Sequence, residues 1–193
     1  MRSAVLACVF AAALLASPPA STQDAAVPVL SEHPVEGTNV RRMQSETVIH
    51  APFDVVAQQV LDYARYPDFL RRVRTARVVR RDRAQTDVYF QLDLPRAMGT
   101  IWFLHRMTVV RTGADRMEIR GAAQAGNVGR VETRVTIERV VGTRSTRFSF
   151  ALFGLPVVPA LPDTVNGTLR DAVRAAAVLL QQRVEREQAM NHR

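Results

Sequence analysis

The alternation of apolar and polar residues predicts a series of β-strands in the middle of the chain. Between about residue 76 and residue 153, apolar side chains recur at every second position, as Phe103 and Met107 do on either side of His105. Successive side chains of a strand point to opposite faces, so this period indicates strands that are buried on one face. Short turn sequences such as residues 112–115 separate the strands, which favours an antiparallel meander.

Apolar residues at helical spacing precede and follow these strands. The first elements expected are a strand over 41–50, a helix that opens at Pro52 and a second short helix from Pro67. After a proline-rich stretch, a period of 3.6 residues predicts a C-terminal helix of about 25 residues. The apolar stripe of that helix needs a cover, and the apolar face of the sheet can supply it. The expected fold class is therefore α+β, with a curved antiparallel sheet wrapped around a long C-terminal helix.

The first twenty residues have the pattern of a targeting segment rather than of folded structure. Arg2 precedes an almost wholly apolar stretch, Ala4–Ala16, which is too short to span a bilayer and is followed by small residues and prolines. This pattern predicts a cleaved secretory signal peptide and a secreted or periplasmic protein; a lipidated Cys8 and an uncleaved anchor are the alternatives. The expected divisions of the chain are a signal peptide over 1–20, a linker over 21–39, a folded domain over 40–188 and a disordered tail over 189–193.

The amino-acid composition gives the chain a basic net charge. The 193 residues include 26 basic and 18 acidic ones, which gives a net charge of +8, and every basic residue is arginine. Seven of the arginines lie in the segment 71–83 (RRVRTARVVRRDR). Such a segment could bind nucleic acid or an anionic membrane surface, or it could simply be exposed to solvent. No nucleic-acid motif accompanies it, so we expect no nucleic-acid partner, while the membrane surface and the solvated face stay open.

Catalytic and metal-binding motifs are missing from the sequence. Cys8 is the only cysteine, so structural disulfides and cysteine-based zinc sites are not expected. The four histidines lack metal-ligand spacing, and neither a nucleophile elbow nor a phosphate-binding glycine loop occurs. We therefore expect no metal, no cofactor and no assigned catalytic residue.

Three segments together resemble a known superfamily. They are 48–73 (VIHAPFDVVAQQVLDYARYPDFLRRV), 120–152 (RGAAQAGNVGRVETRVTIERVVGTRSTRFSFAL) and 161–185 (LPDTVNGTLRDAVRAAAVLLQQRVE). In this order they resemble the START-like, or SRPBCC, superfamily, and more closely its bacterial polyketide cyclase/dehydrase and coenzyme Q-binding START-type group, over about residues 40–187. The resemblance implies a helix-grip fold with a hydrophobic cavity between the sheet and the long helix. Lipids, quinones, sterols and polyketides are the ligands that it implies, and the fold alone does not select among them.

His105 is the titratable residue most relevant to such a cavity, because the alternation places it on the apolar face. It could be a core histidine bonded to the backbone, a residue that orients the polar head of a ligand, or a general acid or base. A register shifted by one residue would instead bring Trp102 and Arg106 into the pocket. The residues expected to bind the ligand are Phe90, Leu92, Phe103, His105, Met117, Ile119, Val135, Phe148 and Phe150 on the sheet and Val165, Leu169 and Val173 on the helix.

Three functional hypotheses follow. The first is an exported domain that binds a hydrophobic small molecule, such as a lipid, an isoprenoid or quinone, or a polyketide-like compound, without catalysis. The second is a cyclase or dehydratase of polyketide-like substrates that uses His105 as acid or base. The third is an envelope protein with a collapsed cavity, whose working surface is the basic segment 71–83.

Overall fold

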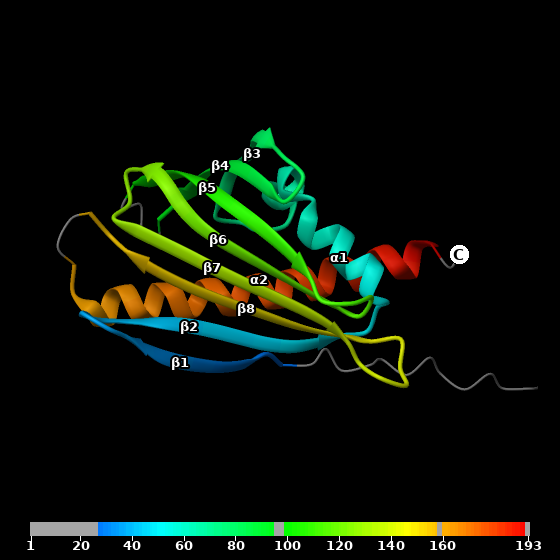
Figure 1. The fold of residues 1–193 in the computed structure, drawn as a ribbon. Helices are drawn as coiled ribbons and strands as arrows, with labels where there is room; N and C mark the ends of the chain where they lie inside the picture. Colours follow the sequence, from blue (N-terminus) through cyan, green and yellow to red (C-terminus); the bar gives the residue numbers. More distant parts are fainter. Residues whose placement is uncertain (1–26, 95–98, 158–159, 192–193) are drawn as a thin grey trace, which may run out of the picture.

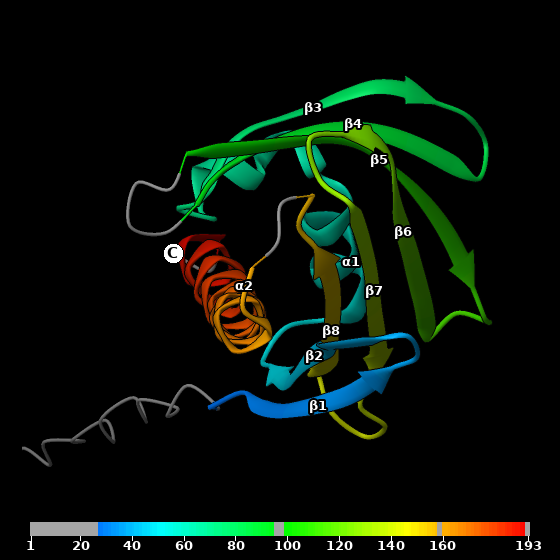
Figure 2. The ribbon, with the colours of Figure 1, turned by 90° about the vertical axis from the view of Figure 1, so that its left-hand side faces the viewer.

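A curved antiparallel sheet surrounds one long helix, α2 (Figure 1). The computed structural model describes residues 27–94, 99–157 and 160–191. In these ranges eight strands form one sheet in the order β1-β2-β8-β7-β6-β5-β4-β3, and every neighbouring pair is antiparallel. Figure 2 shows how the sheet curls around α2. The predicted α+β class is therefore confirmed.

The elements follow one another along the chain much as the sequence pattern predicts, with α1 and η1 near the start and α2 at the end. The strands are β1 (Val29–Val35), β2 (Thr38–Ile49), β3 (Val73–Arg81), β4 (Gln85–Asp93), β5 (Thr100–Arg111), β6 (Arg116–Gly126), β7 (Arg130–Arg139) and β8 (Thr146–Leu155). The helices are α1 (Phe53–Leu61), the 3₁₀ helix η1 (Tyr63–Asp68) and α2 (Pro162–Asn191). In the described ranges no helix is both long and apolar enough to cross a membrane.

The linker predicted over 21–39 is wrong for its second half. Val29–Val35 forms the edge strand β1, which pairs with β2 through a turn in which Gly37 has a φ of 78°. An edge strand with mostly exposed side chains has no apolar face to produce an alternation. Pro34, which argues against an interior strand, falls at an irregularity in the pairing. The predicted signal peptide and the start of the predicted linker lie outside the described residues.

Two smaller predictions also need correction. The second short helix does not begin at Pro67; η1 runs over Tyr63–Asp68 and contains this proline. The predicted tail is wrong for residues 189–191, because α2 continues to Asn191, and residues 192–193 lie outside the described part. A proline inside a short 3₁₀ turn breaks few hydrogen bonds, which explains why it did not mark a helix start here.

The helix α2 packs against one side of the curled sheet. It contacts β2 and β8, where the Ser45 hydroxyl donates a hydrogen bond to the Val173 carbonyl at 2.9 Å. At the start of α2, the Asn166 side chain accepts a hydrogen bond from the Arg41 backbone N–H at 2.8 Å. Since α2 is held close to β2 and β8, a space can remain between it and strands β4 and β5 on the opposite side of the curve.

Candidate functional site

A cavity of about 580 Å³ occupies the space between α2 and the concave face of the sheet. Its walls come from β4, β5, β7, β8 and α2, and the segment that joins η1 to β3 closes one side. The lining is mostly apolar, and this volume falls in the range typical of small-molecule sites. The cavity is open, so the hypothesis of a collapsed one does not fit the structure.

Seven of the twelve predicted site residues line this cavity. The strand alternation correctly selected the side chains that face inward on β4, β5, β7 and β8, and the helical period selected one residue of α2. These seven are Phe90, Leu92, Phe103, His105, Val135, Phe150 and Leu169. The placement of the six strand residues follows from the pleat of each strand, because the alternation in the sequence shows which side chains share a face.

The other five predicted residues lie elsewhere, and the prediction that all twelve share one cavity is wrong for them. Met117 and Ile119 are buried in the core cluster that also contains the α1 residues. Phe148 lines a separate recess of about 70 Å³. Val173 and Val165 pack with the second core cluster. The reason is geometric, because one face of a strongly curved sheet covers α1 along part of its length and the cavity along the rest.

Several residues of the lining were missed, and the helix shows why. Successive helical residues point about 100° apart, so Val173 faces β2 while its neighbour Ala172 faces the cavity. The cavity side of α2 is formed by small or short side chains, including Ala172, Ala175 and Ala176. Small residues on this face leave volume empty that larger ones would fill. In the sequence, the three consecutive alanines at 175–177 were the signal that could have indicated a cavity on this side of the helix. The remaining lining residues that were not predicted are Tyr66, Leu70, Arg71, Arg72, Val73, Asp93, Leu94, Ile101, Met107, Val131, Thr133, Leu152, Thr168, Asp171 and Leu179.

The register prediction that places His105 inward is confirmed. His105 is only 1% exposed, and its ring makes edge contacts with Phe90 and Phe103 at centroid distances of 6.3 and 5.4 Å. The shifted register is excluded because Trp102 is 41% exposed and stacks on Tyr89 at 6.1 Å.

Arg106 also points away from the cavity. Its guanidinium donates two hydrogen bonds to the Asp87 carboxylate, at 2.8 and 3.0 Å. This bidentate contact holds the pKa of Asp87 below its usual range. The pair stands on the outer face of neighbouring strands β4 and β5, as the unshifted register requires.

Only one hydrogen bond of the His105 side chain is formed in the described part of the chain. Nε2 lies 2.9 Å from the Thr133 hydroxyl, and Nδ1 is buried without a partner. His105 belongs to β5 and Thr133 to β7, so the two side chains meet across the intervening strand β6. A Cβ on Gly121 of β6 would stand 2.2 Å from Nε2 and 2.4 Å from the Thr133 hydroxyl oxygen. The absence of a side chain at Gly121 therefore makes this contact possible.

Burial controls the protonation of His105. Desolvation lowers the pKa of His105 to about 4, because the charged imidazolium loses its hydration and gains no anionic partner. The ring is therefore neutral at neutral pH. It can donate or accept a hydrogen bond, but it offers no charge to the cavity.

We expect acidification to destabilise the protein through His105. The unfolded chain takes up the proton near the ordinary pKa of 6.5 and the folded chain only near 4, so stability falls as the pH falls between these values. Between pH 7 and pH 4.5 the contribution is about 2.5 kcal/mol. Chemical denaturation at the two pH values should show this loss in the wild type and a smaller one in His105→Phe. The exposed residue His50 supplies the control, since His50→Phe should keep the wild-type dependence; equal losses in all three proteins would contradict the assignment.

Exposed charged residues surround the cavity at its rim. Arg71 and Arg72 come from the segment between η1 and β3, Asp93 from the end of β4, and Asp171 from α2. Asp93 is engaged by the Thr100 hydroxyl at 3.2 Å and by Arg74 at 3.8 Å. In the part of the chain that the structure describes, Arg71 and Arg72 have no carboxylate partner. Two arginines of the basic segment 71–83 therefore lie at the cavity rim without a carboxylate partner among the described residues.

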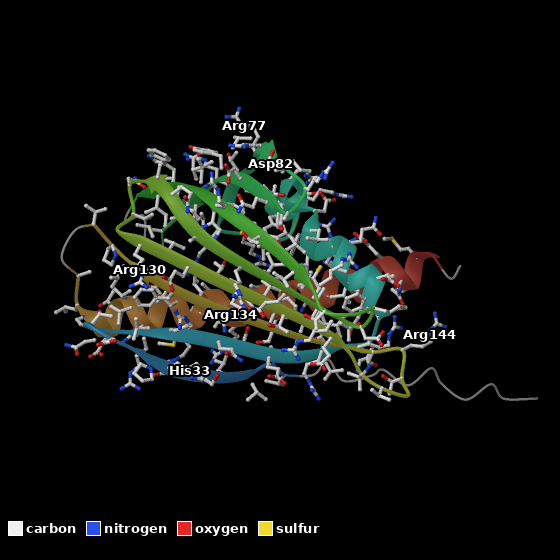
Figure 3. All side chains as sticks on the ribbon, viewed as in Figure 1. His33, Arg77, Asp82, Arg130, Arg134 and Arg144 are labelled. Atoms are coloured by element: carbon white, nitrogen blue, oxygen red, sulfur yellow. The ribbon has the colours of Figure 1, made fainter. Side chains whose placement is uncertain are left out.

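The outer face of the sheet carries much of the remaining charge as ion pairs. Arg130 and Arg134 stand on β7 (Figure 3) and contact Glu132 and Glu118 at 2.6 and 3.2 Å. Arg77 on β3 stacks over the Tyr89 ring at 5.9 Å. Exposed pairs of this kind add little stability each, and they describe a solvated face rather than a site.

Comparison with known proteins supports the fold. A scan against protein-family models and a search of curated proteins gave no match. Among solved structures, a STAR-related lipid transfer protein from Xanthomonas axonopodis matches with a TM-score of 0.73 and 13% identity, over 84% of this chain and 99% of that one. The lipid transfer and protein localization domain of human StarD13 matches with a TM-score of 0.65 and 16% identity, over 81% and 88%. The Zhui aromatase/cyclase from a Streptomyces species matches with a TM-score of 0.59 and 16% identity, over 76% and 94%.

The chain has the START-like, or SRPBCC, helix-grip fold, as the sequence resemblance predicted. At such low identities the likeness shows the fold alone. The closer likeness to the polyketide cyclase/dehydrase and coenzyme Q-binding group stays a prediction. The fold alone does not select a function, so the chemistry of the site has to be argued from the cavity itself.

Proposed function

We propose that this chain is a binding domain that holds one hydrophobic small molecule in the cavity between the sheet and α2. The observation that carries the proposal is the open volume of about 580 Å³ with walls such as Phe90, Phe103 and Phe150. Removing apolar surface from water contributes about 25 cal/mol per Å², so an apolar ligand gains most of its affinity from these walls. Lipids, isoprenoids or quinones and polyketide-like molecules have the required character. Two of the matched structures carry lipid transfer in their names, which agrees with the proposal.

Catalysis by His105 is less well supported than binding. The ring lines the cavity, as a cyclase or dehydratase would require, and one matched structure is an aromatase/cyclase. Efficient general acid–base catalysis needs a pKa near the working pH. Because burial lowers the pKa of His105 to about 4 and its side-chain partner is a threonine hydroxyl, the imidazole is a weak base at neutral pH. The geometry therefore favours a binding role.

Native mass spectrometry of the purified protein, followed by solvent extraction, tests the proposed function. We expect a second mass that corresponds to one bound hydrophobic molecule per chain and that disappears after extraction. The delipidated protein should then take up a neutral fluorescent dye such as Nile red with a stoichiometry of one. A protein that carries no ligand and takes up no dye would overturn the proposal.

We also propose that the rim of the cavity meets an anionic membrane surface. Arg71 and Arg72 are exposed, line the cavity and have no carboxylate partner in the described ranges. A basic residue near an anionic bilayer contributes about 1 kcal/mol. A membrane contact at this rim would place the opening of the cavity next to the bilayer. A hydrophobic ligand that leaves the bilayer would then be close to the cavity.

Charge reversal at the rim should weaken membrane binding. Losing the two attractions in Arg71→Glu/Arg72→Glu corresponds to about a 30-fold weaker affinity for vesicles that contain anionic lipid. Flotation with phosphatidylcholine vesicles and with vesicles that contain phosphatidylserine measures the effect. Arg144→Glu, an exposed arginine on the turn between β7 and β8 (Figure 3), is the matched control and should bind as the wild type does. Equal flotation with both vesicle types would argue for a purely solvated face.

Export of the protein is a proposal that rests on residues 1–20. A charged residue, a short apolar stretch and small residues support a cleaved signal peptide. N-terminal sequencing of protein recovered outside the cytoplasm is the test, and a retained Met1 would contradict cleavage.

A further inference from the structure

The cavity contains one polar pair in a wall that is otherwise mainly apolar. His105 and Thr133 both line the cavity and contact each other at 2.9 Å. Phe90 and Phe103 pack on the His105 ring. The charged residues of the lining are exposed at the rim, and the hydroxyls of Tyr66 and Thr168, which also line the cavity, already donate to backbone carbonyls. The His105–Thr133 pair differs from these groups because it includes a buried nitrogen without a partner in the described part of the chain.

The pair keeps unused hydrogen-bonding capacity in either tautomer. If the Thr133 hydroxyl donates to Nε2, then Nδ1–H is a free donor and the hydroxyl oxygen is a free acceptor. If Nε2–H donates to the hydroxyl oxygen, then Nδ1 is a free acceptor and the hydroxyl hydrogen is a free donor. Nδ1 is buried without a partner in the described part of the chain, and no second hydrogen bond of the Thr133 side chain forms there. One donor and one acceptor therefore remain in both cases.

Buried polar atoms are seldom left unpaired, because the loss of hydration costs about 1–3 kcal/mol for each group. The His105–Thr133 pair also depends on a specific arrangement of three strands. It bridges β5 and β7 and requires Gly121 on the strand between them, whose Cβ would overlap both side chains. An apolar residue at either position would line the cavity with no such cost.

We propose that the ligand carries a neutral hydroxyl or carbonyl oxygen and that this oxygen binds to the His105–Thr133 pair. The inference rests on the proposed function and names the class of ligand within it. A hydroxyl both donates and accepts, so it complements the pair in either tautomer, whereas a carbonyl uses the free donor. The neutral imidazole supplies no charge to compensate a desolvated carboxylate or phosphate, so an anionic group is not expected to bind there. The ligand class is thus a mono-oxygenated apolar molecule rather than a plain hydrocarbon.

A matched pair of probes tests this inference. 1-Dodecanol and dodecane share the same apolar chain and differ in one hydroxyl, and their affinities can be measured by displacement of Nile red. The ratio of the two affinities is compared between the wild type and Thr133→Val, and between the wild type and His105→Phe/Thr133→Val. Comparing ratios removes the difference in hydration between the probes. We expect the preference for the alcohol to fall about tenfold in the double variant and by a smaller factor in Thr133→Val.

Thr136→Val is the matched control, because Thr136 lies on the same strand as Thr133 but does not line the cavity. This variant should keep the wild-type ratio. If both probes bind and the ratio is the same in all four proteins, the inference is wrong and the proposed function stands. If neither probe binds to the wild type, the proposed function itself fails. A co-purified ligand without a neutral oxygen would also overturn the inference.

Discussion

Replacing Ala176 with tryptophan should abolish most ligand binding while the fold is kept. Ala176 lies on the cavity side of α2 and lines both the main cavity and the small recess beside it. A tryptophan there occupies space that the ligand would use. If the ligand loses about 100 Å² of apolar contact, its affinity falls roughly 70-fold at 25 cal/mol per Å². The indole fills empty volume rather than packed core, so the free energy of unfolding should not decrease.

Affinity for Nile red and the midpoint of thermal unfolding are the two measurements for this variant. Gln182→Trp is the control, because residue 182 is exposed on the same helix and does not line the cavity. The control should bind the dye as the wild type does. Unchanged binding in Ala176→Trp would show that the dye occupies another site and would remove the main support for the proposed function.

Gly121→Ala should strongly destabilise the protein. The new Cβ would stand 2.2 Å from His105 Nε2 and 2.4 Å from the Thr133 hydroxyl oxygen, where real carbon atoms do not approach. One side chain or the strand itself has to move, and overpacking of this kind typically costs 1–3 kcal/mol. We expect a loss of about 3 kcal/mol in the free energy of unfolding, because the His105 ring is enclosed by two phenylalanines. Urea denaturation measures it.

A double-mutant cycle shows whether the clash is with His105. In a His105→Ala background the clash with the ring is removed and the Thr133 side chain can turn into the vacated space, so Gly121→Ala should cost about 1–3 kcal/mol less than it does in the wild type. Gly167→Ala is the control, because nothing lies within 4 Å of a Cβ at this helical position. That change should be neutral or stabilise the protein by up to about 1 kcal/mol. Independent effects of Gly121→Ala and His105→Ala would contradict the geometry described here.

The inward face of the strands was predictable because burial imposes a period of two on the sequence. Phe90, Phe103 and His105 could be placed toward the cavity from their spacing alone. Edge strand β1 could not be found in this way, since both of its faces are largely exposed and it carries Pro34. The length of α2 was underestimated because its last turns are polar and lack an apolar stripe.

The candidate site was only partly predictable, because apolar core and cavity wall have the same signature. Met117 and Ile119 alternate as regularly as Phe103 does, but they contact the core beside α1 rather than the cavity. Nothing in the local pattern distinguishes a space filled by another element from a space left empty. Ala172 and Ala176 were missed for the same reason, since a small residue in an apolar stripe can allow close packing as well as leave a void.

The sequence by itself determined the order of the elements, the α+β class, the side of each strand that is buried and the resemblance to the START-like superfamily. These features are local, because each depends on the spacing of residues along a single element. Only the tertiary structure decided where the cavity lies, which residues surround it and which two polar groups meet inside it. The contact of His105 with Thr133 joins strands that are separated by Gly121 of a third strand. Such a contact depends on register, curvature and the absence of one side chain, and these are properties of the assembled sheet rather than of any segment.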